Sequence, residues 1–255
     1  MIKRMAGRVA CMVRPQCRYE RAVFILGHMR CGSTALSNVL CGHPEVSGYG
    51  EAHIRYGDRS ALGILTLNQQ RRRALRPQSR YLFDKILHSR YDLEPDPGFL
   101  QARAIFLFRE PVRTIISIRN LFQSIGSHEY STDTLAADYY EERLNSLMAS
   151  WARFPPSRRL GFTHDMLTAN PDAGLGAISA MLELDPPLAN QYRATTASQA
   201  PGAGDPLASH RHSSIVRVDV DMPDGAAAGM LEIHPTRVER LGQIFREFRK
   251  SVTQT

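Results

Sequence analysis

A short apolar run followed by a glycine-bracketed loop constrains the fold of this 255-residue chain more than any other stretch. Residues 23–26 are all apolar and fit a strand that is buried on both faces of a parallel sheet. The loop 27–32 begins and ends with glycine, and residues 33–40 predict a helix that stops before Pro44. A strand, a tight loop and a helix N-terminus in this order form an anion site, because backbone N–H groups and the helix dipole point at one place.

The spacing of this loop is close to that of the phosphate loop in nucleoside-triphosphate enzymes. That loop has two glycines separated by four residues, followed by lysine and then serine or threonine. Gly27 and Gly32 match the two glycines, but Ser33 stands in the place of the lysine, and a cation lies inside the loop as Arg30. We therefore predict a phosphate site that is not built for a metal-bound triphosphate.

Apolar runs alternate with helical patterns along the rest of the chain. Further strands are expected at 80–87, 104–108, 160–163 and 215–220, and helices at 60–74, 111–121, 132–154, 170–184 and 235–249. This alternation predicts a single P-loop-like α/β domain over residues 21–255, with a central, mostly parallel sheet flanked by helices. Residues 1–20 are expected to form a poorly ordered or loosely docked arm. Residues 195–214 have no periodicity and are interpreted as a lid, a binding loop or a disordered segment.

The charge of the chain favours an anionic partner without identifying it. The formal net charge is +7, and only three of the 32 basic residues are lysine, so Lys85 is the only lysine away from the chain ends. The basic run 71–76 is interpreted as a solvated helix end, and no nucleic-acid partner is expected. A non-enzymatic basic module that binds nucleic acid or anionic lipid through this run is kept as an alternative.

Cysteine content and hydropathy indicate in which cellular compartment the protein is expected and whether it crosses a membrane. The four cysteines lack the paired spacing of metal ligands and are too few for a disulfide scaffold, which favours a reducing compartment. No apolar run approaches the roughly 18–20 residues of a membrane span. The basic start, residues 1–14, lacks the apolar core and cleavage site of a signal peptide. We therefore predict a cytoplasmic protein with neither a metal site nor a transmembrane segment.

The expected strand ends carry cations. In an open α/β sheet, ligands bind beyond the carboxyl ends of the strands, which brings together residues 30–34, Lys85 and Arg109. Ser117 lies on the helix that follows Arg109, and an arginine and a hydroxyl placed in this way can hold a second phosphate. A kinase or nucleotide hydrolase, the alternative enzyme class, uses an aspartate at such a strand end to hold magnesium. Only Asp84 ends a strong apolar strand here, so this alternative is disfavoured.

These motifs resemble those of sulfotransferases that use 3′-phosphoadenosine-5′-phosphosulfate as the donor. The 5′-phosphosulfate loop of that family, R-S-G-[ST]-T, corresponds to residues 30–34, with Cys31 in the place of the serine. The 3′-phosphate motif, an arginine at a strand end and a serine eight residues later, corresponds to Arg109 and Ser117. Residues 163–185 resemble a third family segment, although His164 stands where the family often has glutamate or tyrosine.

The resemblance implies which residues hold the donor. Positions that contribute their backbone N–H group tolerate a change of side chain, so Cys31 is compatible with the motif. The implied donor-binding residues are Arg30, Cys31, Gly32, Ser33, Thr34, Ala35, Arg109 and Ser117.

The resemblance also implies the catalytic residues. Tyrosylprotein sulfotransferases and many bacterial relatives place a glutamate 21 residues after the loop arginine, which is Glu51 here, and a lysine at the end of the second core strand, which is Lys85. Glu51 would be the general base for an acceptor hydroxyl, with His53 as the alternative base. Lys85 and Arg30 would stabilise the charge on the leaving oxygen. The implied acceptor is a hydroxyl of a carbohydrate, a glycolipid or another small metabolite.

Overall fold

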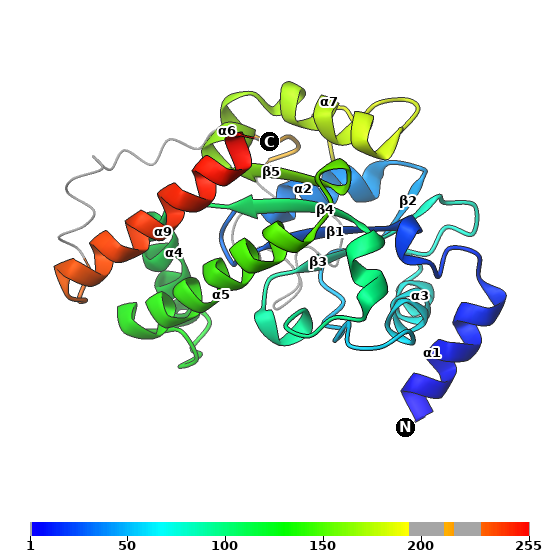
Figure 1. Cartoon of the computed structure of the whole chain (residues 1–255), viewed down its shortest axis with the longest axis horizontal. Coiled ribbons are helices and arrows are strands. Elements are labelled where there is room, and N and C mark those ends of the chain that lie inside the picture. The colour runs from blue at the N-terminus through cyan, green and yellow to red at the C-terminus, as the bar shows by residue number, and fades with distance from the viewer. Residues whose placement is uncertain (1, 194–211, 217–230, 255) are drawn as a thin grey trace.

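The computed structural model describes residues 2–193, 212–216 and 231–254. Its centre is a sheet of five strands: β1 Ala22–Gly27, β2 Val46–Ser47, β3 Tyr81–Ile86, β4 Arg103–Phe108 and β5 Arg159–Thr163. The strands lie in the order β2-β3-β1-β4-β5, and every neighbouring pair is parallel (Figure 1). The prediction of an α/β fold is therefore confirmed, and β1, which leads into the glycine-bracketed loop, occupies the middle of the sheet.

Helices cover both faces of the sheet. These helices are α2 Ser33–Gly42, α3 Ala61–Arg71, α4 Pro111–Ser124, α5 Asp133–Arg153, α6 His164–Ala169, α7 Pro171–Leu182 and α9 Pro235–Thr253, and a further helix, α1 Ile2–Val13, packs on α3. Helices α2, α6 and α7 pack on one face, and α3, α4, α5 and α9 pack on the other (Figure 1). Within the part of the chain that the structure describes, no helix has both the length and the apolarity that a membrane crossing requires.

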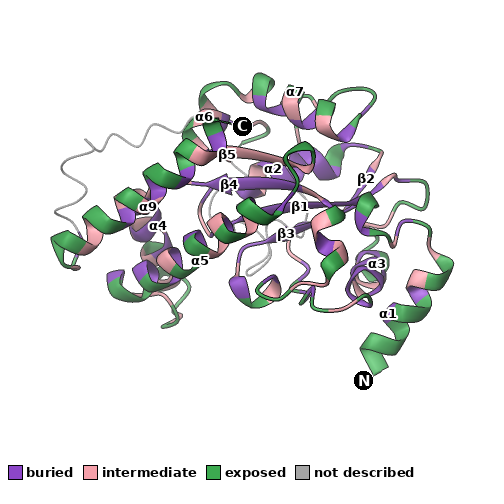
Figure 2. Cartoon of the chain, in the orientation of Figure 1, coloured by how far each residue is buried: buried purple, intermediate pink, exposed green. Residues whose placement is uncertain are grey.

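The burial of β1 explains its sequence. Phe24 and Leu26 belong to the core beneath α3, α4, α5 and α9, whereas Val23 and Ile25 belong to the core beneath α2 and α7. All six residues of the strand are buried (Figure 2). A strand that is buried on both faces favours apolar residues on both, so β1 shows a continuous apolar run instead of an alternation.

The structure differs from the sequence predictions in four places. The first residues form helix α1, which packs on α3, in place of a loosely docked arm. The edge strand β2 and the short helix α6, which precedes the predicted helix α7, were not predicted. Residues 215–216 are not in a strand, and the rest of the predicted strand 215–220 lies outside the described residues. Most of the predicted loop 195–214 also lies outside them.

A buried arginine on α5 joins the helix to the sheet. The Arg143 guanidinium donates through Nε to the carbonyl oxygen of Gly27 at 2.8 Å and through Nη2 to that of Ile86 at 2.9 Å. It also pairs with the carboxylate of Asp92, with 2.6 Å between Nη1 and Oδ1, and both side chains are 1% exposed. Arg143 thus satisfies carbonyl groups at the carboxyl ends of the two central strands β1 and β3.

Replacing Arg143 with alanine should destabilise the fold severely. The change leaves the Asp92 carboxylate buried without its counter-charge, and breaking a buried pair in this way costs about 3–5 kcal/mol. Urea unfolding followed by circular dichroism measures the loss. Arg80→Ala is the matched control, because Arg80 pairs with Glu183 on the surface, where solvent screens the pair. Equal losses in the two variants would contradict a special role for Arg143.

Candidate active site

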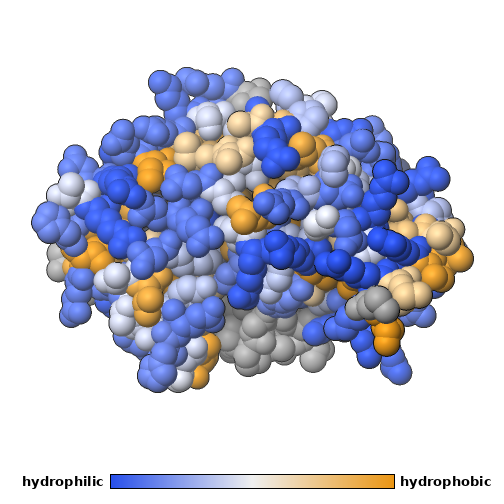
Figure 3. All heavy atoms as spheres, turned by 60° about the horizontal axis from the view of Figure 1, so that its bottom comes forward, coloured by the Kyte–Doolittle hydropathy of each residue, from blue (hydrophilic) through white to orange (hydrophobic). Residues whose placement is uncertain are grey.

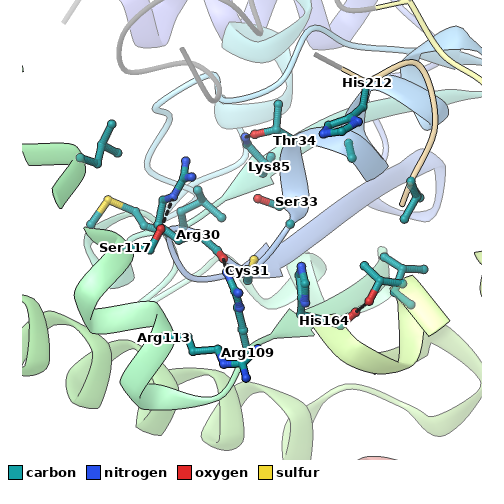
Figure 4. Close-up of a pocket in the computed structure, with 18 of the residues that line it drawn as sticks. Arg30, Cys31, Ser33, Thr34, Lys85, Arg109, Arg113, Ser117, His164 and His212 are labelled. Carbon is teal, nitrogen blue, oxygen red and sulfur yellow. Dashed lines mark hydrogen bonds between the residues drawn. The ribbon is translucent and has the colours of Figure 1, made fainter. Parts of the chain in front are cut away.

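A cavity of about 510 Å³ opens beyond the carboxyl ends of β1, β3 and β4 (Figure 4). This is the edge of a parallel sheet at which ligands bind. The cavity brings together every side chain and loop position that the sequence analysis proposed for the site. Its lining includes Arg30, Cys31, Gly32, Ser33, Thr34, Ala35, Glu51, His53, Lys85, Arg109 and Ser117.

The loop between β1 and α2 has the conformation that its glycine predicts. Gly32 precedes the helix as its N-cap, with φ of 91°, a value that glycine adopts without steric cost. A Cβ atom at this position would also lie only 3.0 Å from Cδ2 of His164. The first N–H groups of any α-helix lack intrahelical partners, and at α2 the N-cap glycine has no side chain that could accept from them. The loop therefore presents a helix N-terminus to the cavity.

Two other loop residues contribute in different ways. Arg30 has φ of 65°, which is uncommon for a residue with a side chain and marks local backbone strain. Cys31 is fully buried, and burial raises the pKa of its thiol. A buried, neutral thiol fills space beneath the loop, and this agrees with a role for Cys31 through its backbone.

Lys85 lies between the phosphate loop and a carboxylate. Its Nζ atom is 3.2 Å from Oε1 of Glu51 and donates to Oγ1 of Thr34 at 3.3 Å. The Lys85 side chain is 1% exposed and that of Glu51 is 11% exposed. His53 lies farther from Glu51 than Lys85 does, with 3.9 Å between its Nε2 and the Glu51 carboxylate. The His53 side chain is 40% exposed. Glu51 and Lys85 therefore form a buried pair at the start of α2.

Asp84, the residue before Lys85, holds the Glu51 loop in place. Successive side chains of a strand point to opposite faces, so Asp84 faces away from the Lys85 ammonium and does not pair with it. Its Oδ1 accepts from the N–H groups of Ala52 and Lys85, both at 2.8 Å, and its Oδ2 accepts from the Tyr56 hydroxyl at 2.6 Å. An aspartate inside an apolar strand was the only sequence signal for this role.

The position of Arg109 is fixed through its backbone. Its N–H group donates to Nε2 of His28 at 2.9 Å, and its carbonyl accepts from the Tyr140 hydroxyl at 2.8 Å. Burial lowers the pKa of His28 to about 4, so the ring is neutral. Since Nε2 accepts, Nδ1 carries the proton and donates to the carbonyl of Met29 at 2.8 Å. These contacts hold the end of β4 against the loop.

Cations are concentrated around Arg109. Burial lowers the pKa of this guanidinium, and the like charges of Arg30 and Arg113 lower it further, against the opposing effect of Glu110 and Asp165. Arg113, on the first turn of α4, lies beside Arg109 (Figure 4), and the sequence motifs did not identify it. A bound anion would relieve the repulsion among these cations.

The two predicted phosphate-binding motifs meet at one residue. Arg30 donates through Nε to Oγ of Ser117 at 2.9 Å, while the Arg30 carbonyl accepts from Nη1 of Arg109 at 3.5 Å (Figure 4). Arg109 and Ser117 thus contact the same loop residue from different sides. The sequence spacing predicted that Arg109 and Ser117 lie close together. It did not predict that both contact Arg30.

Further lining residues belong to no motif and were missed. Apolar and aromatic side chains make up much of this set, which includes Met29, Leu87, His88, Ile116, Leu121, Tyr192, His212 and Ile215. Burial lowers the pKa of His88 to about 4, so it adds no positive charge. Because His212 and Ser214 line the cavity, the described end of the predicted loop 195–214 reaches the site. Across residues 2–193, 212–216 and 231–254, no group of three or more His, Cys, Asp or Glu side chains is arranged as metal ligands; the absence of a metal stays a prediction.

Comparison with known proteins supports the same family as the motifs. The sulfotransferase family profile matches residues 98–187, which include Arg109 and Ser117. A sulfotransferase domain from the curacin biosynthetic pathway is 16% identical, with a TM-score of 0.52, over 88% of this chain and 96% of that one. A sulfotransferase domain from the olefin synthase of Synechococcus PCC 7002 is 19% identical, with a TM-score of 0.53, over 91% of this chain and 97% of that one.

The resemblance to sulfotransferases is confirmed by these findings taken together. At such low identity the two solved structures show the shared fold alone, and the profile match identifies the family segment. No curated protein matches the sequence.

The buried carboxyl group of Asp84 should make stability depend on pH. Burial raises its pKa from the usual 3.8 to about 7. A group whose pKa is raised in the folded state contributes stability that is fully present below its unfolded pKa and is lost as the pH rises through its folded pKa. For this shift, the loss between about pH 4 and about pH 8 is on the order of 4 kcal/mol.

Asp84→Asn provides the matched comparison. The amide oxygen still accepts from the N–H groups of Ala52 and Lys85, and the amide nitrogen can donate to the Tyr56 hydroxyl, so the variant removes the titration and keeps the contacts. Urea unfolding should show that the wild type loses stability relative to the variant as the pH rises through 7. A difference that stays constant with pH would contradict this assignment.

Proposed function

We propose that this chain, which shares its fold and a central segment with the sulfotransferase family, transfers a sulfuryl group from 3′-phosphoadenosine-5′-phosphosulfate to an acceptor hydroxyl. The observation that carries this proposal is the position of Lys85 between Thr34 and Glu51. A buried cation there lies next to both the anion-binding helix N-terminus and a carboxylate that can accept a proton. The same cavity therefore contains a helix N-terminus for the donor anion, a cation for the leaving oxygen and a carboxylate for the proton, the three groups that the proposed transfer needs.

The residues of the site fit a donor with two separate anionic groups. The helix N-terminus of α2, with the loop residues 30–35, would hold the 5′-phosphosulfate, because N–H groups and the helix dipole favour an anion there. Arg109 and Ser117, with Arg113 as an added cation, would hold the 3′-phosphate. The three arginines that line this part of the cavity, Arg30, Arg109 and Arg113, support a polyanionic ligand.

Each catalytic residue has a distinct part in the proposed reaction. When bound, the donor would supply an activated sulfuryl group. The acceptor oxygen would attack its sulfur in line, forming a new S–O bond while the bond to the 5′-phosphate oxygen breaks and adenosine 3′,5′-bisphosphate leaves. Glu51 accepts the proton of the acceptor hydroxyl, a role that typically contributes 10²–10⁴-fold in rate. Lys85 and Arg30, with the N–H groups of the loop, stabilise the negative charge on the leaving phosphate oxygen.

The cavity wall near Glu51 bears on the kind of acceptor. We propose a hydroxyl of a carbohydrate, a glycolipid or another small metabolite. Met29, Leu87 and His88 line the same cavity as Glu51, so an acceptor with an apolar part beside its hydroxyl fits this wall. A P-loop kinase fits less well, because Ser33 occupies the place of the lysine in its loop.

Donor binding should depend on Arg109. Adenosine 3′,5′-bisphosphate at 100 times its dissociation constant should stabilise the wild type by about 2.7 kcal/mol, measured as a shift of thermal unfolding. Arg109→Ala should weaken the bisphosphate much more than adenosine 5′-phosphate, which lacks the 3′-phosphate. Arg103→Ala is the control, because Arg103 lies at the other end of the same strand. Protection by magnesium ATP but not by the bisphosphate would contradict the proposed donor.

Catalysis should depend on Glu51. Glu51→Gln should lower the rate of transfer by about 10²–10⁴-fold while bisphosphate binding persists, because the amide cannot accept the proton. Transfer is measured with labelled donor and a panel of glycans, glycolipids and other hydroxyl compounds. Glu142→Gln, at an exposed position on α5, is the control. If His53→Gln abolished transfer and Glu51→Gln did not, the base would be His53.

A further inference from the structure

Helix α1 is attached to the domain through its small residues. Gly7 and Ala10 are the buried residues of the helix. A Cβ atom on Gly63 of α3 would overlap the carbonyl group of Gly7, so the two helices approach as closely as their backbones allow. Arg4 adds an ion pair with Asp58, with 3.4 Å between Nε and Oδ2. One side of α1 is therefore fixed to the domain.

The opposite side of α1 is an exposed apolar stripe. Each of its residues lies three or four positions from another member of the set, which places them on one face of the helix. The stripe consists of Ile2 (83% exposed), Met5 (60%), Val9 (59%), Met12 (82%) and Val13 (70%). In the part of the chain that the structure describes, these are five of the nine large hydrophobic side chains that are exposed. Such a concentration on one surface marks an interaction site.

Figure 3 shows hydrophobic side chains gathered at the right-hand edge of the molecule, where α1 lies, with hydrophilic side chains beside them. No packing against the domain explains these residues, because the face that contacts α3 is the one with Gly7 and Ala10. The stripe is thus available to a partner outside the described part of the chain.

The charges beside the stripe identify the kind of partner. Helix α1 contains Lys3, Arg4 and Arg8, all exposed, and no acidic residue; of these, Arg4 pairs with Asp58 of the domain, and Lys3 and Arg8 add further positive charge. Arg8 is three residues from Met5 and four from Met12, so it borders the stripe directly. Arg14 follows the helix. A second copy of the chain would bring the same cations together across the stripe, which is unfavourable.

We propose that the apolar stripe of α1 binds the surface of a membrane that contains anionic lipids. An amphipathic helix with cations beside its apolar face lies in the plane of the interface, with apolar side chains among the acyl chains and cations at the headgroups. The docked helix is already formed, so binding does not require the chain to order a new segment. This inference is independent of the proposed function, since it concerns a different surface and a different ligand.

Vesicle co-sedimentation tests the proposal with the full chain. The wild type should bind phosphatidylcholine vesicles that contain phosphatidylglycerol more tightly than vesicles of phosphatidylcholine alone, and added salt should weaken this binding. Val9→Asp should lower the partition coefficient by about tenfold or more, because it places a charge in the apolar face. Leu93→Asp is the matched control, since Leu93 is also exposed (63%) but lies outside α1, and it should bind as the wild type does.

Several outcomes would overturn the proposal. One is that the wild type does not bind the anionic vesicles, and another is that Leu93→Asp lowers binding as much as Val9→Asp. A third is a dimer of the wild type in lipid-free buffer that Val9→Asp dissociates, measured by analytical ultracentrifugation, because the stripe would then contact a second copy. The double variant Met5→Gln, Met12→Gln keeps the test decisive if Val9→Asp does not fold: it should also lower binding to anionic vesicles, and unchanged binding would count against the proposal.

Discussion

The Arg143 guanidinium connects the stability of this fold to the geometry of its site. Its acceptors are the last residue of β1 and the residue after Lys85 on β3, together with the buried carboxylate of Asp92. The same two strand ends lead into the phosphate loop and carry the lysine of the site. A buried cation whose three nitrogens all donate hydrogen bonds fixes the relative position of these strand ends more strictly than apolar packing, because its hydrogen bonds are directional.

The charged groups of the cavity are arranged in layers. Lys85 and Glu51 are paired inside the cavity, and Asp84 lies behind them with its oxygens occupied by backbone and tyrosine donors. Arg109 is held through its own backbone by neutral His28. Side chains that line the cavity are thus supported by neighbours that lie behind them. Such support reduces the reorganisation that a reaction in the cavity would require.

The sequence predicted the central strands and the phosphate loop because their signals are local. Burial on both faces favours a continuous apolar run, as in residues 23–26. An N-cap position with positive φ favours glycine, as at Gly32. The two-residue edge strand β2 gave no such signal. Helix α1 was missed because its apolar residues face away from the domain and its contacts with α3 use glycines, which carry no hydrophobic pattern.

Some residues of the site could also be predicted from local sequence signals, and others could not. Arg30, Arg109 and Ser117 stand at fixed spacings, so the motif identified them. The role of Asp84 depends on Tyr56, and that of His28 depends on the end of a strand far along the chain. Contacts of this kind arise only from the topology of the sheet, and no spacing within one segment predicts them.

The hydrogen bond between Arg30 and Ser117 has a thermodynamic consequence. Arg30 already uses its Nε–H on the hydroxyl of Ser117, so an anion that attracts either side chain changes the environment of the other. The free energies contributed by the two ends of a polyanionic ligand are then not additive. A ligand with one anionic group binds while the hydrogen bond between Arg30 and Ser117 still joins the loop to α4. A ligand with two anionic groups competes with that bond for both of its side chains. Affinities measured with fragments therefore cannot be summed to give the affinity for the whole.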